Sequence, residues 1–163
     1  GMVESQLEQL ADISSRAQGE MRALLLHLRP VELNGESLSD AVISLLKELR
    51  GKTNLVFSAS IDDIPDIPIA VEEHLFRIVQ ESLSNILRHS GAQKIELVLE
   101  ERDGYVYLFI GDNGKGFNVD ETKKVSYGLK NMRERTEEIG GTFTLRSQEG
   151  KGTYIEVRVP LRR

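Results

Sequence analysis

Hydrophobic positions near the start of the chain recur in alternating steps of four and three residues. They are Val3, Leu7, Leu10, Ser14, Ala17, Met21, Leu24 and Leu28, with Ser14 as the polar interruption. This is a heptad seam, which is buried only against a partner helix. We expect residues 1–30 to be a helix that pairs with a helix of another chain or of a missing segment. The alternative is an amphipathic helix packed on its own domain.

The rest of the chain alternates helical and extended patterns. Pro30 ends the first helix, and residues 31–35 are expected to form a hinge. The expected helices cover residues 37–50, 71–89 and 128–139, and the expected strands cover 55–60, 95–100, 105–110, 142–146 and 154–160. The local signals are a capping box at Ser37 and Asp40, a stop at Gly51, a hairpin turn at Arg102-Asp103-Gly104 and a helix C-cap at Gly140-Gly141. Residues 118–127 lack periodicity and predict a mobile loop.

Composition narrows the class of protein. Of the 163 residues, 39% are hydrophobic and 29% charged, which is typical of a soluble domain. The net charge of -5 and the lack of a basic block argue against a nucleic-acid surface. Without cysteine, disulfides and thiolate chemistry are excluded, and a reducing compartment fits. No segment looks like a membrane span or signal peptide, and Gly1 before Met2 suggests a fragment of a longer protein.

One edge of the helix expected at residues 71–89 is polar. Glu81, Asn85, Arg88 and His89 follow one another at helical spacing beside a buried stripe. Amide and carboxylate oxygens are hard ligands for Mg²⁺, and cations meet phosphate charge, so this edge suits a magnesium–polyphosphate site. The alternative is an ordinary solvated face with ion pairs along the helix.

A second candidate site follows the strand expected at residues 105–110. The segment Asp112-Asn113-Gly114-Lys115-Gly116-Phe117 places a carboxylate at the strand exit, followed by two glycines. Glycine adopts positive φ and has no side chain, so a flat ring or a phosphate can approach the backbone. The alternative is a tight turn. Two known motifs fail here: Gly51-Lys52-Thr53 lacks the first glycine of a phosphate loop, and residues 113–118 lack the third glycine of a dinucleotide fingerprint.

Four segments, taken together and in this order, resemble the ATPase domain of sensor histidine kinases, within the wider GHKL group. Those segments are Glu81-Ser82-Leu83-Ser84-Asn85-Ile86-Leu87-Arg88-His89-Ser90 (N box), Asp112-Asn113-Gly114-Lys115-Gly116 (first glycine box), Gly128-Leu129 (second glycine box) and Gly150-Lys151-Gly152-Thr153 (last glycine box). The resemblance covers residues 36–163, and residues 85–90 and 128–135 are most similar to the subfamily paired with NarL-type response regulators.

The resemblance implies a two-layer α/β sandwich, in which a mixed sheet carries helices on one face and ATP lies between them. Asp112 is then the acceptor for the amino group of adenine. Guanine presents a carbonyl there, and the unpaired contact costs roughly 1–3 kcal/mol, which favours ATP over GTP. Gly114 and Gly116 let the base lie against the chain, and Thr153 helps to hold a water beside it.

The resemblance also assigns the phosphate side of the site. Asn85 binds Mg²⁺, and Glu81 polarises the attacking nucleophile or a water. Arg88, with His89, meets the phosphates. The N–H groups of Gly128 and Leu129 offer them a helix N-terminus.

One departure from the family concerns the phospho-accepting histidine, which stands early on the first of two dimerisation helices. None of His27, His74 and His89 has that setting. Residues 1–30 instead resemble the second dimerisation helix, residues 31–35 a hinge and residues 36–163 the ATP-binding catalytic domain. The fragment is therefore expected to bind Mg-ATP and, alone, at most to hydrolyse it slowly.

The resemblance implies further partners for the full-length protein: a response regulator of NarL type and a second copy joined through the N-terminal helix. It implies a cytoplasmic domain, with any membrane anchor upstream of this sequence. Two alternatives remain on the same fold. One is a non-catalytic ATP-sensing scaffold, against which intact Glu81 and Asn85 argue. The other is an anti-sigma serine kinase, which would not need the heptad helix.

Overall fold

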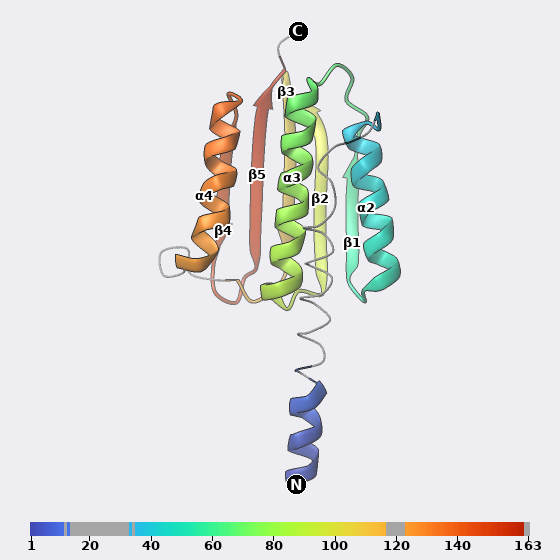
Figure 1. Cartoon of the computed structure of the whole chain (residues 1–163), viewed down its shortest axis with the longest axis vertical. Coiled ribbons are helices and arrows are strands. Elements are labelled where there is room, and N and C mark those ends of the chain that lie inside the picture. Colours follow the sequence, from blue (N-terminus) through green and yellow to red (C-terminus); the bar gives the residue numbers. More distant parts are fainter. Residues whose placement is uncertain (12, 14–32, 34, 117–122, 162–163) are drawn as a thin grey trace.

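The chain folds into two layers, a sheet and a layer of helices on one of its faces (Figure 1). The computed structural model describes residues 1–11, 13, 33, 35–116 and 123–161, without the side chains of residues 89–90 and 123–128. The helices are α2 (Leu38–Lys52), α3 (Ile69–Asn85) and α4 (Lys123–Glu138), and a single π-helical turn, Ile86–Ser90, continues α3. The strands are β1 (Val56–Ile61), β2 (Lys94–Arg102), β3 (Tyr105–Asp112), β4 (Thr142–Ser147) and β5 (Thr153–Pro160).

The sheet has five strands in the order β1-β2-β3-β5-β4. The pair β1–β2 is parallel and the other pairs are antiparallel, so the sheet is mixed. The turn between β2 and β3 has two central residues with positive φ, Asp103 at 51° and Gly104 at 81°. Two positive φ values in a two-residue loop match the twist of the flanking strands, as in a type I′ hairpin. The expected hairpin and the expected fold class are confirmed.

The helix boundaries differ from the expected ones at three places. Gly51 was expected to close α2, but it lies inside the helix, because one glycine costs a helix only about 1 kcal/mol. Helix α3 stops at Asn85, and the π turn that follows ends at Gly91, which is left-handed with a φ of 60°. Helix α4 begins at Lys123, five residues before Gly128, in a segment expected to be a loop.

The start of α2 is fixed by two hydrogen bonds. The Ser37 hydroxyl accepts from the Asp40 N–H (3.1 Å), as the capping signal predicted, and the Glu72 carboxylate of α3 accepts from the Leu38 N–H (2.8 Å). Both satisfy donors that a helix cannot pair internally. Helix α2 is therefore tied to α3 as well as packed on the sheet.

The core lies between the sheet and the helices. Every second residue of the inner strands faces it, and α2 contributes the apolar stripe expected from its sequence. The largest fully buried side chains are Leu38, Leu45, Leu75, Ile78, Leu83, Ile95, Leu97, Leu99, Leu108, Ile110, Val42 and Val79. Asp112 follows Leu108 and Ile110 at the same alternation, so this carboxylate stands at the end of a core-facing row.

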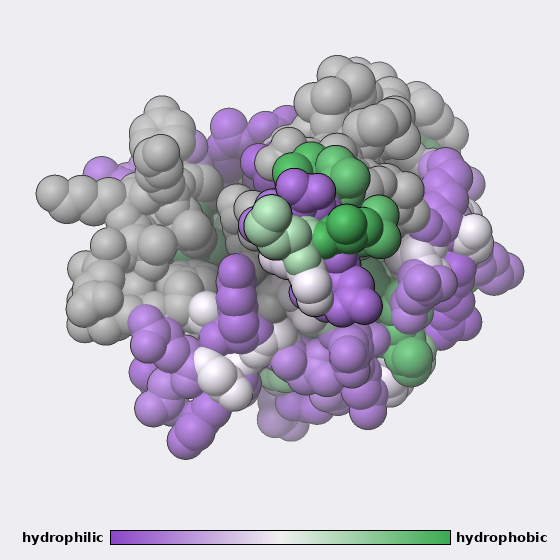
Figure 2. Space-filling view, turned by 90° about the horizontal axis from the view of Figure 1, so that it is seen from below, coloured by the Kyte–Doolittle hydropathy of each residue, from purple (hydrophilic) through white to green (hydrophobic). Residues whose placement is uncertain are grey.

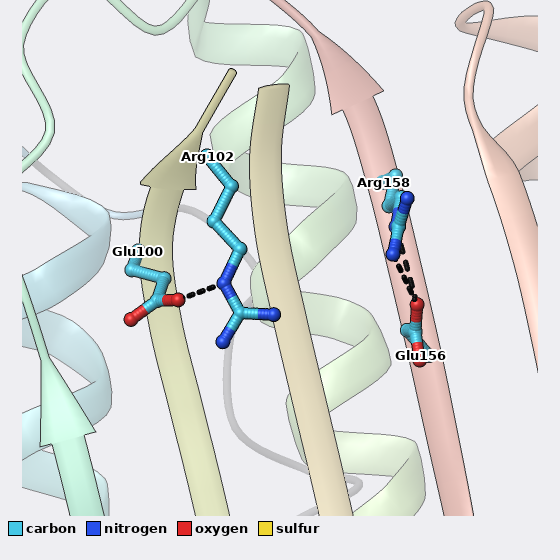
Figure 3. A network of polar contacts seen from close by, with 4 residues as sticks. All are labelled: Glu100, Arg102, Glu156 and Arg158. Carbon is cyan, nitrogen blue, oxygen red and sulfur yellow. Dashed lines mark hydrogen bonds and ion pairs between the residues drawn. The ribbon is translucent and has the colours of Figure 1, made fainter. Parts of the chain in front are cut away.

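The opposite face of the sheet is covered by its own side chains. Glu100 pairs with Arg102 along β2, and Glu156 pairs with Arg158 along β5 (Figure 3). Both guanidinium groups lie over the Tyr107 ring, with the Arg102 carbon 3.9 Å and the Arg158 carbon 5.6 Å from its centroid. In the part of the chain that the structure describes, cation–π contacts and ion pairs thus cover this face.

Residues 2–11 form a helix that extends away from the sandwich (Figure 1). Its seam residues Val3, Leu7 and Leu10 are 69%, 60% and 63% exposed. Viewed from that end, Figure 2 shows hydrophobic residues on the surface of the molecule. This part of the seam is not packed on its own domain. The seam positions from Ser14 onward and most of the expected hinge, residues 31, 32 and 34, lie outside the described residues.

No described helix has the length and apolar character required to cross a membrane.

The end of α4 has the geometry of a Schellman motif, as the Gly140-Gly141 signal predicted. The Gly141 N–H donates to the Thr136 carbonyl (2.9 Å), and the Gly140 N–H donates to the Glu137 carbonyl (3.0 Å), with Gly140 at a φ of 80°. A Cβ on Gly141 would meet the Arg158 carbonyl oxygen at 2.7 Å. The end of α4 therefore packs directly against β5.

Two other glycines allow backbone to pack on backbone where β3 ends. A Cβ on Gly116 would collide with the Gln148 carbonyl, and a Cβ on Gly152 would collide with the Asp112 carbonyl. The Gly150 N–H donates to the Lys115 carbonyl across the same contact (2.6 Å). The segment after β3 and the turn before β5 thus form one tightly packed unit.

This packing predicts different costs for alanine at two neighbouring glycines. Gly150 and Gly152 have nearly the same φ, 78° and 80°, but a Cβ on Gly150 meets nothing within 4 Å. We expect Gly152→Ala to lower the free energy of unfolding by about 1–3 kcal/mol more than Gly150→Ala, because only the former adds a steric clash. Urea titrations of both variants measure the difference, and equal losses would contradict the close approach.

Candidate functional site

Several sequence-predicted site residues gather at one end of the sandwich, the lower end in Figure 1. Strand β3 ends there at Asp112 and β5 starts there at Thr153, and these two residues are direct partners in the antiparallel ladder. The C-terminal end of α3, which carries Asn85, and the start of α4 lie at the same end (Figure 1). Segments far apart in the sequence therefore meet at one end of the molecule.

Asp112 is a half-buried carboxylate held by backbone donors. Its Oδ1 accepts from the Gly114 N–H (2.8 Å), and the Thr153 N–H also donates to the side chain. Burial raises the pKa of Asp112, and the two backbone hydrogen bonds offset part of that rise. The side chain is fixed in place at the end of a core-facing row, and it is an acceptor whenever it is ionised.

Thr153 is half-buried and belongs to a small hydroxyl network. Its Oγ1 lies 2.7 Å from the Ser147 Oγ, and the Ser147 hydroxyl also approaches the Gly152 carbonyl (3.3 Å). The network links β4 to β5 next to Asp112. The Ser147 hydroxyl thus holds the Thr153 hydroxyl in place, on the residue whose N–H donates to the Asp112 carboxylate.

The two glycines after Asp112 have different roles in the structure. Gly114 is buried, and its N–H orients the Asp112 carboxylate. At Gly116 the space that a side chain would fill is taken by the Gln148 carbonyl. Sequence reasoning gave both glycines to a bound base, but the structure explains Gly116 by close packing of the chain on itself.

The polar edge of α3 also carries a residue that contacts α4. His74 lies on this edge, seven residues before Glu81, and its Nε2 is 3.0 Å from the Thr136 Oγ1 of α4. Glu81 and Asn85 are half-buried and Arg88 is exposed. Because the π turn starts after Asn85, the α-helical spacing that grouped Arg88 and His89 with them no longer holds. The side chain of His89 lies outside the described residues.

The segment at Gly128-Leu129 differs from its predicted role. Because α4 begins at Lys123, the Gly128 N–H is inside the helix and is not one of its free terminal donors. The Leu129 side chain is buried in the hydrophobic core. The expectation that these two residues open a helix toward phosphate groups is wrong for this structure, since the helix starts earlier than the glycine suggested.

Sequence reasoning missed two structural contacts at the site. The Asn113 Oδ1 accepts from the Gln93 and Lys94 N–H groups (3.0 and 2.9 Å), so this side chain ties the exit of β3 to the entrance of β2. The second is the His74–Thr136 contact between α3 and α4. Asn113 had a readable signal, because Asn after a strand often bonds nearby backbone. His74 had none, since its partner is 62 residues away.

A pocket of about 240 Å³ lies behind Asp112, on the sheet face away from the helices. Its lining residues are Lys94, Glu96, Phe109, Gly111, Asp112, Asn113, Lys151, Thr153 and Tyr154. The Phe109 and Tyr154 rings stack there with centroids 5.4 Å apart, and a Cβ on Gly111 would touch the Phe109 ring. The pocket does not include Asn85, so it does not join the two predicted halves of the site.

The side chains at this end of the molecule can bind a ligand through hydrogen bonds and oxygen ligands. Asp112 offers a fixed acceptor, and Glu81 and Asn85 offer carboxylate and amide oxygens. Among the described residues, no three His, Asp or Glu side chains converge into a metal cluster. In nucleotide sites Mg²⁺ is commonly held by one or two protein oxygens together with substrate phosphates, and the α3 edge has donors of that type.

Comparison with solved structures shows the same fold. The histidine kinase domain of the blue-light activated histidine kinase EL346 from Erythrobacter litoralis aligns with a TM-score of 0.64 at 17% identity, over 98% of this chain and 86% of that one. The ATP-binding domain of PrrB from Mycobacterium tuberculosis aligns with a TM-score of 0.60 at 21% identity, over 78% of this chain and 96% of that one.

Comparison with curated proteins finds sensor proteins. The sensor histidine kinase LiaS of Bacillus subtilis is 50% identical over 149 residues, which is 91% of this chain and 41% of LiaS. The sensor protein VraS of Staphylococcus aureus is 48% identical over 159 residues, which is 98% of this chain and 46% of VraS. The chain thus spans less than half the length of these relatives.

The match to a protein family covers the site described above. Residues 70–163 match the family described as histidine kinase-, DNA gyrase B-, and HSP90-like ATPases. They contain α3 apart from Ile69, the end of β3, α4 and the turn before β5. With the shared fold and the similarity to LiaS and VraS, this match shows that the chain belongs to the family of histidine kinase-, DNA gyrase B- and HSP90-like ATPases.

Proposed function

We propose that this chain is the ATP-binding catalytic domain of a two-component sensor histidine kinase, with part of its dimerisation helix. It delivers the γ-phosphoryl group of ATP to a histidine outside this fragment, for relay to a response regulator. The observation that carries the proposal is the gathering of Asp112, Thr153 and the Asn85 end of α3 at one end of the sandwich. The 50% identity to a sensor histidine kinase supports it.

Adenine recognition is assigned to Asp112. The carboxylate accepts from the exocyclic amino group of adenine, while the Gly114 and Thr153 N–H groups keep it oriented. Because the side chain is already fixed, little rotamer entropy is lost on binding. Thr153 holds a water beside the base. Gly114, which has no side chain, leaves room for the base. Gly116 contributes through the packing that shapes this segment.

Phosphate and metal binding are assigned to the α3 edge. Asn85 supplies an amide oxygen to Mg²⁺, and half-buried Glu81 polarises the attacking group or a water. Bound Mg²⁺ neutralises charge that develops on the phosphates. Arg88 and His89 add positive charge beyond Asn85. Gly128 and Leu129 remain assigned to the nucleotide as backbone neighbours in α4, without a role as a helix N-terminus.

The domain organisation follows from the same reading. Residues 1–30 are the second helix of a dimerisation domain, residues 31–35 a hinge and residues 36–163 the catalytic domain. The exposed seam residues Val3, Leu7 and Leu10 support a homodimer through this helix. The response regulator is of NarL type, and the domain works in the cytoplasm. Any membrane contact is made by segments upstream of this sequence.

Two alternatives predict different phosphorylated products. A scaffold that only senses ATP forms none, and an anti-sigma kinase phosphorylates serine. The exposed N-terminal seam favours the histidine kinase, because an anti-sigma serine kinase does not need a heptad helix.

The adenine assignment predicts that Asp112→Asn weakens ATP binding. The amide can place a donor against the amino group of adenine, and an unmatched polar contact costs roughly 1–3 kcal/mol, or about 5-fold to 150-fold in affinity. Asp103→Asn, the same change in the turn at the other end of β3, is the control and is expected to leave affinity unchanged. Calorimetric titration measures the affinities of both variants for ATP and for GTP. An Asp112→Asn variant that binds ATP with the parental affinity would refute the assignment.

The metal assignment predicts a selective effect of Asn85→Ala. ATP affinity in EDTA is expected to stay at the parental value, while the gain in affinity on adding Mg²⁺ is lost, because the amide oxygen acts through the metal. Titrations with and without Mg²⁺ measure the gain. An equal Mg²⁺ response in the variant and the parent would contradict the role of Asn85.

The phosphorylated product distinguishes the three functions. We expect the full-length protein, incubated with γ-labelled ATP, to acquire a label that is lost in acid, as for phosphohistidine. The change Glu81→Gln is expected to reduce labelling by at least about 100-fold while ATP binding persists, since it removes the polarising carboxylate. Acid-stable label would indicate a serine kinase, and no label in the parent would indicate a scaffold.

A further inference from the structure

One buried polar contact joins the two helices on either side of the candidate nucleotide site. His74 of α3 is 9% exposed and Thr136 of α4 is fully buried. The Thr136 hydroxyl donates to the Met132 carbonyl one turn earlier (2.6 Å), and its oxygen lies 3.0 Å from the His74 Nε2. Since the hydroxyl proton is committed to Met132, we assign the Nε2–H tautomer to His74, which donates to Thr136.

The surroundings of His74 keep its imidazole ring uncharged. Burial, with Arg135 and Arg77 nearby, lowers the pKa of His74 from 6.5 to about 4. The ring is therefore uncharged at neutral pH, and the contact is an ordinary hydrogen bond between two buried neutral groups. A shift of one helix against the other would leave the buried histidine donor without a partner, which is unfavourable.

Beyond its last turn, which the Gly140-Gly141 motif fixes against β5, the described part of α4 is held by a few apolar side chains and by the Arg133 guanidinium over the Phe143 ring (5.8 Å). The sequence of α4 is mostly charged and polar, and the buried apolar side chains described on it are Leu129 and Met132. Apolar contacts are non-directional, and methionine adapts to many shapes, so two such residues permit rotation and sliding. Thr136 is on the same stripe, four residues after Met132, and adds the directional contact that the stripe lacks.

The contact is placed to act on the site at a distance. His74 lies on the same edge of α3 as Glu81 and Asn85, about 10 Å and about 16 Å further along the helix axis. On α4, Thr136 is about 20 Å from the start of the helix at Lys123. Asp112 is carried by β3 and does not depend on this contact. A displaced α4 therefore changes the distance between the start of α4 and Asn85 while the adenine acceptor stays in place.

We propose that His74 and Thr136 are positioning residues that hold α4 in register on α3, so that the phosphate side of the nucleotide site has its correct width. The inference rests on the proposed function. It implies that the contact matters for the triphosphate and not for the nucleoside, because adenosine needs only the Asp112 end.

The test is the ratio of the affinities for Mg-ATP and adenosine in the whole 163-residue chain. We expect Thr136→Val, which removes the hydroxyl at nearly constant shape, to weaken Mg-ATP about tenfold and adenosine less than about twofold. Thr136→Ser keeps the hydroxyl and is expected to retain the parental ratio. Calorimetry measures Mg-ATP, and NMR titration measures adenosine.

A double variant separates positioning from stability. His74→Leu with Thr136→Val replaces both polar partners with apolar groups, so its melting temperature is expected to recover relative to Thr136→Val alone. Its Mg-ATP to adenosine ratio is expected to stay reduced, because an apolar contact does not fix the register. If Thr136→Val and the double variant both keep the parental ratio of Mg-ATP to adenosine affinity, this inference is overturned and the proposed function still stands. A parent that binds neither ligand would overturn the proposed function and this inference with it.

Discussion

The packing of backbone on backbone at the end of β3 is the constraint on which the candidate site depends. The segment after Asp112 lies directly on the turn before β5, with a hydrogen bond from the Gly150 N–H to the Lys115 carbonyl (2.6 Å). Neither Gly116 nor Gly152 has room for a Cβ. Because of this packing, the Gly114 and Thr153 N–H groups converge on the Asp112 carboxylate, whose partners are then set before any ligand arrives.

The second half of the candidate site is on a helix that changes from α to π geometry directly after Asn85. Helix α3 is regular from Ile69 to Asn85 and continues as a π turn to Ser90. A π turn takes an additional residue per hydrogen-bonded turn and often occurs at functional sites. Glu81 and Asn85 therefore keep the spacing of an α-helix, whereas Arg88 is turned relative to them. The change separates Glu81 and Asn85 from the positive charge of Arg88 in angle as well as in position along the helix.

The two faces of the sheet are stabilised in different ways. The inner face buries aliphatic side chains under three helices, and the outer face relies on Tyr107 beneath two guanidinium groups that are also paired with carboxylates. The helical layer thus carries the hydrophobic stabilisation, and the described side chains of α4 add a narrow apolar stripe to it. A directional hydrogen bond compensates where apolar contact is sparse, which is the physical basis of the role inferred for His74 and Thr136.

The sequence by itself determined the features that depend on neighbours along the chain. Alternation specified the strands, Asp103-Gly104 specified the hairpin, and Ser37 specified the start of α2. The resemblance of four segments, in their order, to known motifs indicated the family. Only the tertiary structure decided what depends on distant partners. It showed that Gly116 accommodates the Gln148 carbonyl, that α4 starts before Gly128, and that His74 meets Thr136. Local signals fix backbone conformation within a few residues, but close packing is a property of two segments, and neither segment encodes the contact alone.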